Sequence, residues 1–374
     1  MTLPDRMHAV VTTGHGGLDK LVYHDDWPVP EVAADEVLIE VGACGMNNTD
    51  INTRTGWYSK AVTDGTTAAG GRDGFAAVGD EDGAWGGAIG FPRIQGADVC
   101  GRVAALGPDA PADLMGRRVM VDTWLRDWDD PLNMDKCRYF GSEVDGGYAQ
   151  YVTAPARNVH PVDSDLGDAE LATFATSYVT AENMLRRAEV GDGDLVLIPG
   201  ASGGVGSALI QLARRRGARP IALCGDAKAD QVKAVGAEAV LPRAPADLAA
   251  ALEANIGRRT VDVVADVVGG DIWPQLIDVL VRGGRYTCAG AIAGPIVAFD
   301  LRTFYLNDLV FTGATIIPPG LFADLVGYVE RGEIKPLLAR TWPLADLREA
   351  QDAFLKKAHV GNFAVVPPPV GDGR

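Results

Sequence analysis

The sequence predicts an α/β protein built from two domains: a parallel β-sheet with helices on both faces, and a mostly β domain. From about residue 164 onward, short apolar segments alternate with helical patterns, as βαβ crossovers require. The residues before 164 form short apolar or alternating segments separated by Gly, Pro and Asp, which is typical of a compact β unit. A chain of 374 residues is long enough for two domains, each with its own core.

Three strands are predicted in the first third, and a glycine-rich segment interrupts them. The strands cover residues 37–42, 99–106 and 118–121. Residues 60–92 contain nine glycines and few large apolar side chains, so we expect an inserted, mobile loop there. A surface excursion without a function is the alternative.

The second part of the chain shows the alternation in order. After a helical pattern at 169–188, strands are predicted at 195–200, 220–224, 239–241, 261–267 and 286–289, and helices at 207–217, 229–235, 246–256 and 273–281. A last helix at 344–357 and a last strand at 362–366 follow a weaker stretch. We expect this tail to return to the first domain, so that residues 1–162 and 305–374 form one domain and residues 163–304 the other.

Composition excludes several classes of function. The chain is 47% hydrophobic and 22% charged, which is a globular composition, and its formal net charge of −16 argues against binding to nucleic acid. The most apolar run, residues 261–281, contains four aspartates, so we expect neither a membrane span nor a membrane partner, and the first residues show no secretory leader. Five scattered cysteines form no motif, and we expect small buried side chains in a cytoplasmic protein.

A glycine-rich turn, GASGGVG at residues 200–206, connects a predicted strand to a predicted helix. Glycines at this place let the chain turn tightly and let backbone N–H groups approach a pyrophosphate at the helix N-terminus. Its position inside a βαβ unit predicts a dinucleotide-binding domain.

The choice of dinucleotide depends on the end of the second strand. An acidic residue there would bind the ribose hydroxyls of NAD, but the strand ends in Cys224 and Gly225. Lys228 follows and favours the 2′-phosphate of NADPH, whereas Asp226 could bind a ribose or repel the phosphate. Alternatively, Asp226 and Lys228 only cap the next helix. We therefore expect NADPH, with NADH not excluded.

Six segments together resemble the medium-chain dehydrogenase/reductase superfamily, and within it the quinone oxidoreductase-like branch. They are GACGMNNTDINTRTGWY (42–58), RIQGADVCGRV (93–103), DGGYAQYV (145–152), ATSYVTAENML (175–185), PGASGGVGSALIQLARRRGA (199–218) and GGRYTCAG (283–290). The resemblance covers nearly the whole chain. It implies a Rossmann cofactor domain and a GroES-like catalytic domain.

The same resemblance implies a reaction without zinc. The positions where zinc-dependent relatives hold the catalytic metal are Asn47, Ala97 and Thr176, and none of these is a thiolate, imidazole or carboxylate. Without a Lewis acid, alcohol oxidation is difficult at neutral pH, whereas hydride delivery to an electrophilic carbon stays feasible. We therefore expect an NADPH-dependent reductase of quinones or α,β-unsaturated carbonyls.

The candidate catalytic residues are Asn47, Tyr58 and Asp50. Asn47 either donates its amide to the substrate oxygen or braces its own loop. Tyr58 either donates a proton or a hydrogen bond to the substrate, or is an amphipathic residue of the cleft wall. For Asp50, the pattern favours an acceptor for backbone N–H groups over an acid or base. The candidate cofactor-binding residues are Thr180, Gly200, Ser202, Gly203, Gly204, Val205, Gly206, Gly225, Lys228, Val267 and Gly290. Thr180 has the alternative of a helix-internal hydrogen bond.

Two other functions remain open at this point. One is a zinc-free alcohol or carbonyl dehydrogenase of narrow, biosynthetic specificity, and the other is an NADPH-binding structural or sensor protein without turnover. The resemblance also implies a homodimer formed through an edge of the cofactor-domain sheet. The apolar segment 310–317 is the candidate edge strand, although an internal strand is nearly as well supported.

Overall fold

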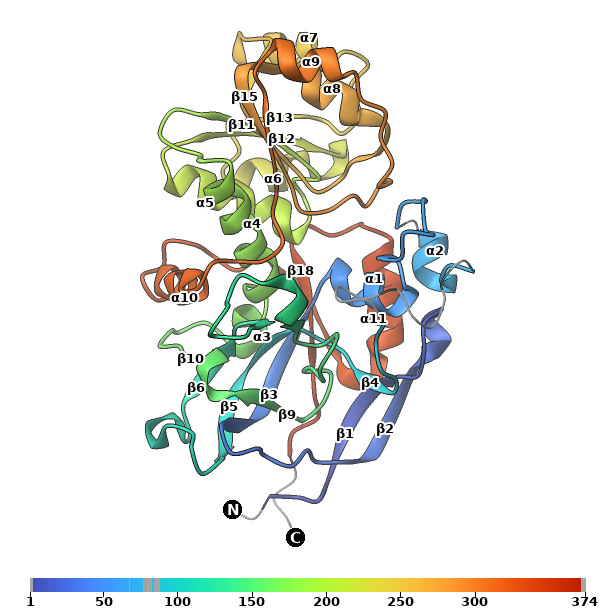
Figure 1. Ribbon diagram of the computed structural model, residues 1–374, viewed down its shortest axis with the longest axis vertical. Helices are drawn as coiled ribbons and strands as arrows, with labels where there is room; N and C mark the ends of the chain where they lie inside the picture. The colour runs from blue at the N-terminus through green and yellow to red at the C-terminus, as the bar shows by residue number, and fades with distance from the viewer. Residues whose placement is uncertain (1–2, 67, 77, 79–82, 84–87, 371–374) are drawn as a thin grey trace.

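The protein consists of two domains that are stacked along its long axis (Figure 1). The computed structural model describes residues 3–66, 68–76, 78, 83 and 88–370. The described residues begin and end at the outer end of the lower, mostly β domain (Figure 1). In the part of the chain that the structure describes, no helix is long and apolar enough to cross a membrane.

The upper domain contains a six-stranded parallel sheet, in the order β13-β12-β11-β14-β15-β16. Its strands are β11 (Leu195–Pro199), β12 (Arg219–Cys224), β13 (Ala239–Pro242), β14 (Val261–Asp266), β15 (Leu280–Cys288) and β16 (Val310–Gly313). Its helices are α4 (Ala175–Arg187), α5 (Gly204–Arg215), α6 (Ala229–Val235), α7 (Leu248–Ile256), α8 (Trp273–Asp278) and α9 (Leu301–Leu306). Val196 and Ile198 of β11 belong to one apolar core, and Leu195 and Leu197 to another. The sheet is therefore buried on both faces, which confirms the predicted fold class.

Several predicted elements differ in their bounds. The helical pattern at 169–188 is two helices, α3 (Asp168–Leu171) and α4, because the chain leaves the helical path at residues 172–174. The helix predicted at 273–281 ends at Asp278, since Leu280 already pairs with Val261 of the neighbouring strand. Strand β15 thus runs through Gly283 and Gly284, whose lack of side chains concealed it in the sequence.

The lower domain is built on a mixed sheet whose strands follow the order β10-β6-β5-β3-β18-β17, with β9 also paired to β3. Its strand pairs are antiparallel except for β17 and β18, which are parallel. The strands are β3 (Glu36–Met46), β5 (Asp98–Leu106), β6 (Arg118–Val121), β9 (Tyr151–Pro155), β10 (Val159–Pro161), β17 (Leu338–Pro343) and β18 (Asn362–Val366). Smaller sheets hold β1 (Arg6–Thr12), β2 (Leu21–Pro28) and β4 (Arg93–Ile94), and β7 (Trp124–Leu125) with β8 (Arg138–Tyr139). Strand β18 pairs with β3, so the last strand of the chain lies in the same sheet as its first part. The boundary predicted at residue 305 is too early, because β16 pairs with β15 in the upper sheet.

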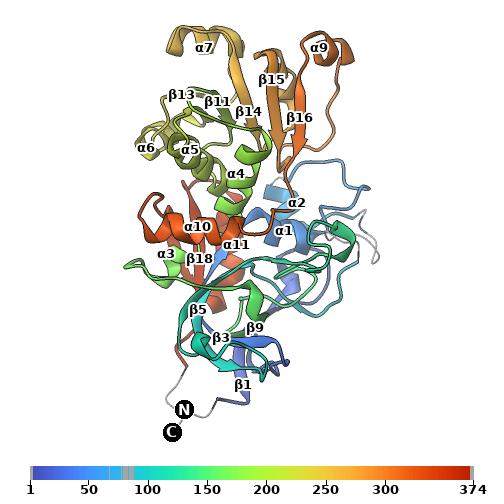
Figure 2. The same cartoon turned by 60° about the vertical axis from the view of Figure 1, so that its left-hand side comes forward.

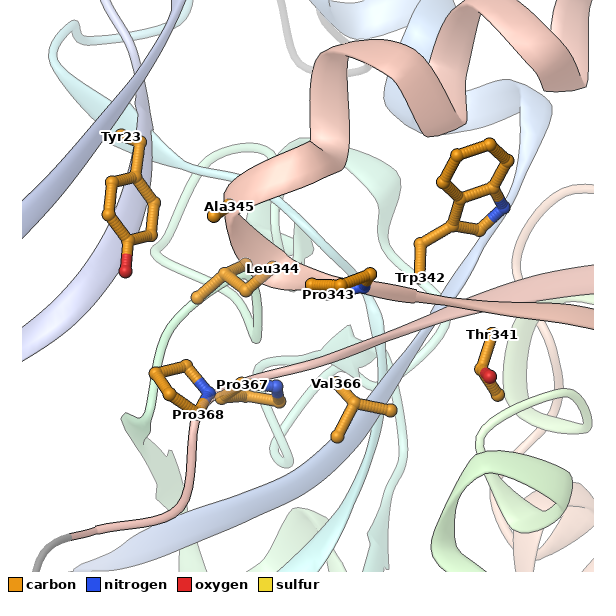
Figure 3. A pocket seen from close by; sticks show the side chains of 9 residues that line it. All are labelled: Tyr23, Thr341, Trp342, Pro343, Leu344, Ala345, Val366, Pro367 and Pro368. Atoms are coloured by element: carbon orange, nitrogen blue, oxygen red, sulfur yellow. The ribbon is translucent and has the colours of Figure 1, made fainter.

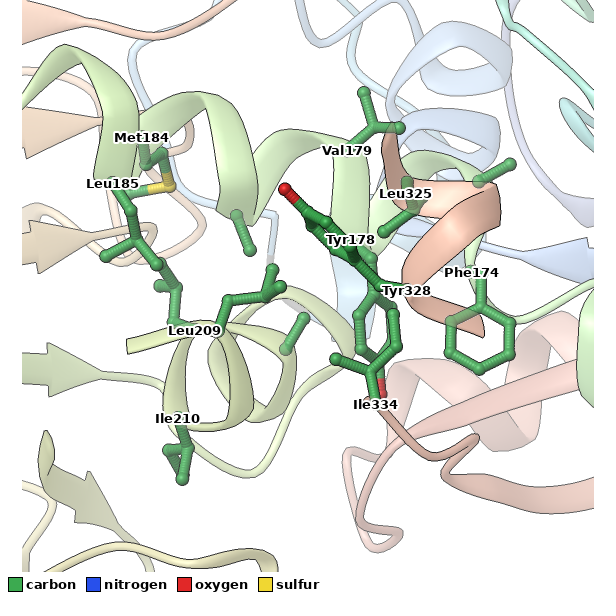
Figure 4. Packing of buried hydrophobic residues seen from close by; sticks show 14 of the residues in the cluster. Phe174, Tyr178, Val179, Met184, Leu185, Leu209, Ile210, Leu325, Tyr328 and Ile334 are labelled. Atoms are coloured by element: carbon green, nitrogen blue, oxygen red, sulfur yellow. The ribbon is translucent and has the colours of Figure 1, made fainter. Parts of the chain in front are cut away.

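Helix α4 connects the domains through a continuous apolar core. Figure 4 shows Tyr178 and Phe174 of this segment packed against helix α10 (Leu321–Glu330) and the α5 side chain Leu209 nearby. The same core includes Ala43 and Cys100 of the lower domain. The two domains therefore share one apolar core along α4.

The glycine-rich insertion is partly ordered onto the lower domain. Helix α1 (Asn48–Thr55) precedes it, α2 (Ala68–Asp73) lies within it, and α2 packs beside α11 (Leu347–Leu355), as Figure 1 shows. The fully buried guanidinium of Arg54 donates to the carbonyls of Gly16 at 2.6 Å and Gly71 at 2.5 Å, and to the Gln351 side chain at 3.0 Å. Residues 67, 77, 79–82 and 84–87 of the predicted insertion lie outside the described residues.

Candidate cofactor and substrate cleft

A cleft of about 520 Å³ lies between the two domains and is lined by residues of both. All of the predicted cofactor-binding residues line it: Thr180, Gly200, Ser202, Gly203, Gly204, Val205, Gly206, Gly225, Lys228, Val267 and Gly290. Asn47 and Tyr58 line its other end, whereas Asp50 lies behind the wall, 2% exposed. The structure thus brings the glycine turn and the predicted substrate-binding residues into one cavity.

The glycine turn has the geometry that a bound pyrophosphate requires. Gly200 has φ = 67°, a left-handed conformation that a side chain would strain. A Cβ on Gly206 would lie 2.3 Å from the carbonyl oxygen of Gly200, whereas a Cβ on Gly203 would meet nothing closer than 3.5 Å. Helix α5 begins at Gly204, so its free N–H groups and positive dipole end face the cleft.

Two cations lie at the adjoining ends of β12 and β13 and line the cleft. Lys228 does not cap α6 with its side chain; its ammonium donates to Ser202 Oγ at 3.0 Å and to the carbonyl of Lys357 at 2.7 Å. Strands β12 and β13 are parallel, and Cys224 pairs with Pro242. Arg243, which follows Pro242, therefore lies beside Gly225, and its exposed side chain lines the cleft.

A third cation, Lys357, reaches across the cleft from the end of α11. Its ammonium donates to Asn48 Oδ1 at 2.6 Å. Burial, together with the charge of Lys228, lowers the pKa of Lys357 to about 7. This partly buried side chain lines the cleft and has no anion among the causes of its pKa shift, so it is suited to binding an anionic ligand.

Asn47 and Tyr58, at the end of the cleft where we expect the substrate, have different hydrogen-bond partners. The Asn47 amide oxygen accepts from Ser177 Oγ at 3.0 Å, and its side chain also bonds to Asp98. The Tyr58 hydroxyl donates to Thr49 Oγ1 at 3.1 Å, and burial raises its pKa to about 12. These contacts favour the bracing interpretation of Asn47.

Two carboxyl groups are buried behind this wall. Asp50 accepts from the backbone N–H of Asn47 at 2.7 Å, as expected for a structural acceptor, and burial raises its pKa to about 7. Asp98, at the start of β5, is 1% exposed, and burial raises its pKa to about 6. The charge of Asp98 also raises the pKa of Asp50, so the two carboxyl groups compete for ionisation.

A network of hydroxyl groups surrounds the positions that correspond to the metal ligands of zinc-dependent relatives. Thr176 donates its hydroxyl and, at 2.9 Å, its backbone N–H to Asp98 Oδ1, and its hydroxyl lies 2.9 Å from the Tyr139 hydroxyl. Ala97 contributes only a methyl group. Among the described residues, no group of three or more His, Cys, Asp or Glu side chains is placed to hold a metal ion.

A second hollow lies on the outer face of the lower domain, away from the cleft. Figure 3 shows it between Tyr23 and the chain around Trp342, Leu344 and Pro367. The Tyr23 hydroxyl bonds to His8 Nδ1 at 2.6 Å, and the other lining groups are mainly apolar. This hollow offers no chemistry comparable to that of the cleft.

Comparison with known proteins places the chain in a family. Residues 33–164 match the alcohol dehydrogenase GroES-like domain, and residues 204–330 match the zinc-binding dehydrogenase domain. A solved structure from Sinorhizobium meliloti 1021, provisionally described as an alcohol dehydrogenase, is 47% identical, covers 98% of each chain and has a TM-score of 0.89. The chain belongs to the medium-chain dehydrogenase/reductase superfamily.

Relatives within this superfamily bear two kinds of name. The human quinone oxidoreductase is 25% identical over 93% of this chain and 94% of its own length. An NAD-dependent alcohol dehydrogenase from Sulfurisphaera tokodaii is also 25% identical, over 92% of this chain and 96% of its own. As a medium-chain dehydrogenase/reductase, the protein is an oxidoreductase that uses NAD(P)H, and the resemblance seen in the sequence is confirmed.

Sequence reasoning missed four residues that line the cleft or lie behind its wall. Arg243 carried no signal of its own, because only the pairing of β12 with β13 brings it to Gly225. Lys357 lies more than a hundred residues from the glycine turn. Tyr139 and Asp98 could be connected to Thr176 only through the fold.

Proposed function

We propose that the protein transfers a hydride from NADPH to a quinone or an α,β-unsaturated carbonyl, without a metal. The observation that carries this proposal is the pair of cations, Lys228 and Arg243, at the adjoining ends of β12 and β13, where a strand-end carboxylate would favour NAD. The positions Asn47, Ala97 and Thr176 add support, since their side chains provide no thiolate, imidazole or carboxylate.

The residues of the cleft fit a bound dinucleotide. The backbone N–H groups of the turn Gly200–Gly206 and the start of α5 would hold the pyrophosphate, with Ser202 and Lys357 beside it. Val267 and Gly290, at the ends of β14 and β15, and Thr180 would frame the remaining parts of the cofactor. When bound, the nicotinamide supplies the hydride.

For the substrate, Tyr58 would turn its hydroxyl hydrogen from Thr49 to the acceptor oxygen, and Asn47 and Asp50 would hold the wall that positions it. Trp57 and Trp124 also line this end of the cleft, and aromatic faces suit a planar conjugated acceptor.

The test is NADPH oxidation with a panel of quinones and enones, before and after dialysis against a chelator. We expect turnover that the chelator leaves unchanged, and a lower Kd for NADPH than for NADH. A rate that disappears with the chelator and returns with zinc would disprove the metal-free chemistry. Tight NADPH binding without turnover would support the structural or sensor function instead.

A second candidate is a zinc-free alcohol or carbonyl dehydrogenase. It is favoured by the buried carboxyl group of Asp98, which two hydroxyl groups connect to the cleft, because alcohol oxidation needs a proton acceptor. Oxidation of an alcohol panel with NADP⁺ tests it.

We also propose a homodimer formed through β16. This strand is at an edge of the described sheet, as Figure 2 shows, and Val310 and the neighbouring α9 residues Leu301, Tyr305 and Leu306 are exposed apolar side chains. Sedimentation of the wild type and of Val310→Lys checks this, and a monomeric wild type would contradict it.

A further inference from the structure

A chain of hydrogen bonds connects the cleft to a buried carboxyl group. Tyr139, in β8, and Thr176, in the first turn of α4, both line the cleft, and their hydroxyl oxygens lie 2.9 Å apart. Thr176 donates both its hydroxyl and its backbone N–H to the same oxygen of Asp98. Asp98 is only 1% exposed, so it reaches the cavity through its partners, which are these two hydroxyl groups and the Asn47 amide. Of these partners, the hydroxyl groups are the ones that can both accept and pass on a proton.

The direction of the hydrogen bonds depends on the protonation of Asp98. A hydroxyl group has only one hydrogen to donate. When Asp98 is ionised, the hydrogen of Thr176 is committed to it, so Tyr139 must donate to Thr176 and its oxygen can accept from the cleft. When Asp98 is protonated, it donates to Thr176 and Thr176 donates to Tyr139. The Tyr139 hydrogen is then available to a substrate oxygen or to Thr123, whose side chain also bonds to Tyr139 and lines the cleft.

The surroundings of Asp98 make both states accessible near neutral pH. The titratable groups that face it are Cys44 on β3, Asp50 on α1, Tyr148 before β9 and Tyr139 itself. None of these is a cation, and the hydrogen bonds from Asn47 and Thr176 only partly offset burial, which raises the pKa of Asp98 to about 6.

We propose that Tyr139, Thr176 and Asp98 form a relay that exchanges one proton with the substrate oxygen. This inference rests on the hydride transfer proposed above. In reduction, the hydride bonds to the substrate carbon and the displaced electron pair remains on the substrate oxygen. That oxygen takes the proton of Tyr139, Tyr139 takes that of Thr176, and Thr176 takes that of Asp98, which becomes a carboxylate. Asp98 recovers its proton from solvent by the same path after product leaves, and alcohol oxidation runs every transfer in reverse.

Tyr58 is the other tyrosine of the cleft, and its connections differ. Its hydroxyl bonds to Thr49 and Asn52, whose side chains do not titrate. Neither of these two partners can replace a lost proton, so Tyr58 is suited to orienting a substrate oxygen. Tyr139 is accordingly the catalytic residue, and Thr176 and Asp98 act through it as positioning residues.

The kinetic test compares Tyr139→Phe, Thr176→Val and Thr176→Ser with the wild type. We expect kcat for reduction to fall roughly hundredfold or more in Tyr139→Phe and Thr176→Val, with the Kd of NADPH unchanged, because general acid catalysis contributes about 10²–10⁴-fold. Thr176→Ser keeps the hydroxyl and should recover most of the rate. The wild-type kcat should decline as pH rises through about 6, and Thr176→Val should lose this decline, whereas Tyr58→Phe should keep it.

Two kinetic results would overturn the relay. One is a kcat in Tyr139→Phe within twofold of the wild type. The other is a Thr176→Ser variant as slow as Thr176→Val, which would assign Thr176 a purely structural role. The Thr176 pair keeps the test decisive even if an Asp98 variant does not fold.

A cofactor-free measurement separates the relay from the proposed function. Infrared spectra of the protein alone should show a protonated carboxyl band that titrates near pH 6, shifts in Thr176→Val and is absent from Asp98→Asn. If the wild type reduces no quinone or enone, the proposed function fails, and the relay is then judged by this band. A band that titrates, shifts in Thr176→Val and is lost in Asp98→Asn supports it. A carboxyl spectrum that Asp98→Asn leaves unchanged throughout pH 4–9 overturns it, because Asp50 also contributes a protonated carboxyl band in this range.

Discussion

The proposed preference for NADPH depends on charge at the ends of β12 and β13, and Arg243→Ala tests it with little risk to the fold. Arg243 is exposed, so its removal leaves no buried group without a partner. Hydrogen bonds to charged groups contribute about 1.5–3 kcal/mol, and solvent screening at an exposed site reduces this to about 1 kcal/mol. At about 1.4 kcal/mol per tenfold, the Kd of NADPH should rise about fivefold.

Lys228→Met should have a larger effect on the same ligand. Its ammonium is partly buried and fixed by Ser202 and the Lys357 carbonyl, so we expect a loss of about 2 kcal/mol, or about thirtyfold in Kd. NADH lacks the 2′-phosphate, and its Kd should change by less than about twofold in Arg243→Ala.

Calorimetric or fluorescence titration with both nucleotides measures these constants at fixed ionic strength. Arg282→Ala is the matched control, because it removes the same charge from β15 at a side chain that is 71% exposed and outside the cleft lining. Equal losses for NADH and NADPH in Arg243→Ala, or an equal loss in Arg282→Ala, would refute recognition of the 2′-phosphate by Arg243.

Three further predictions concern the cleft and the insertion. Gly203→Ala should keep the wild-type melting temperature but bind NADPH at least tenfold more weakly, because the new methyl group has room in the protein but not beside a bound phosphate. Gly206→Ala should lower the melting temperature as well. An unchanged Kd of NADPH in Gly203→Ala would contradict the placement of the phosphate at this turn. The pKa of Lys357 is lowered to about 7 in the free protein, and a bound phosphate should raise it. NADPH binding near pH 7 should therefore take up a fraction of a proton and weaken as pH rises further. Calorimetry in two buffers of different ionisation enthalpy measures this proton uptake, and Lys357→Met should abolish the uptake. Arg54→Met should reduce the free energy of unfolding by about 3 kcal/mol in a urea titration, because it leaves two buried carbonyls and the Gln351 side chain without their donor. An unchanged midpoint of unfolding would show that other contacts hold α2.

The local parts of this structure could be predicted from sequence because their signals are local. Helix α6 and strands β6 and β18 have the predicted bounds, and every predicted cofactor residue lines the cleft. Each of these depends on a short apolar period or on a turn with few possible conformations. The fold class followed from the alternation of such segments.

The remaining parts depend on pairing between distant segments. Strand β15 was concealed by Gly283 and Gly284, and it is a strand because β14 and β16 hydrogen-bond to it on both sides. The relay joins Asp98 to Thr176, 78 residues away, and no periodicity connects two such positions. Asn47 was correctly placed in the cleft, but whether its amide was free depended on Ser177, in the other domain.

The buried guanidinium of Arg54 has a consequence for how the length of this protein can change. One side chain satisfies carbonyls of Gly16 and Gly71 and the amide of Gln351, so the insertion has become part of the hydrogen-bonding of the core. Deleting residues 60–92 alone would leave a buried positive charge with one acceptor fewer. The resulting loss in free energy of unfolding would be large compared with the stability of an ordinary domain. Loss of the segment and loss of the arginine should therefore occur together, and among related sequences an arginine at this position should accompany a long insertion and be absent where the insertion is short.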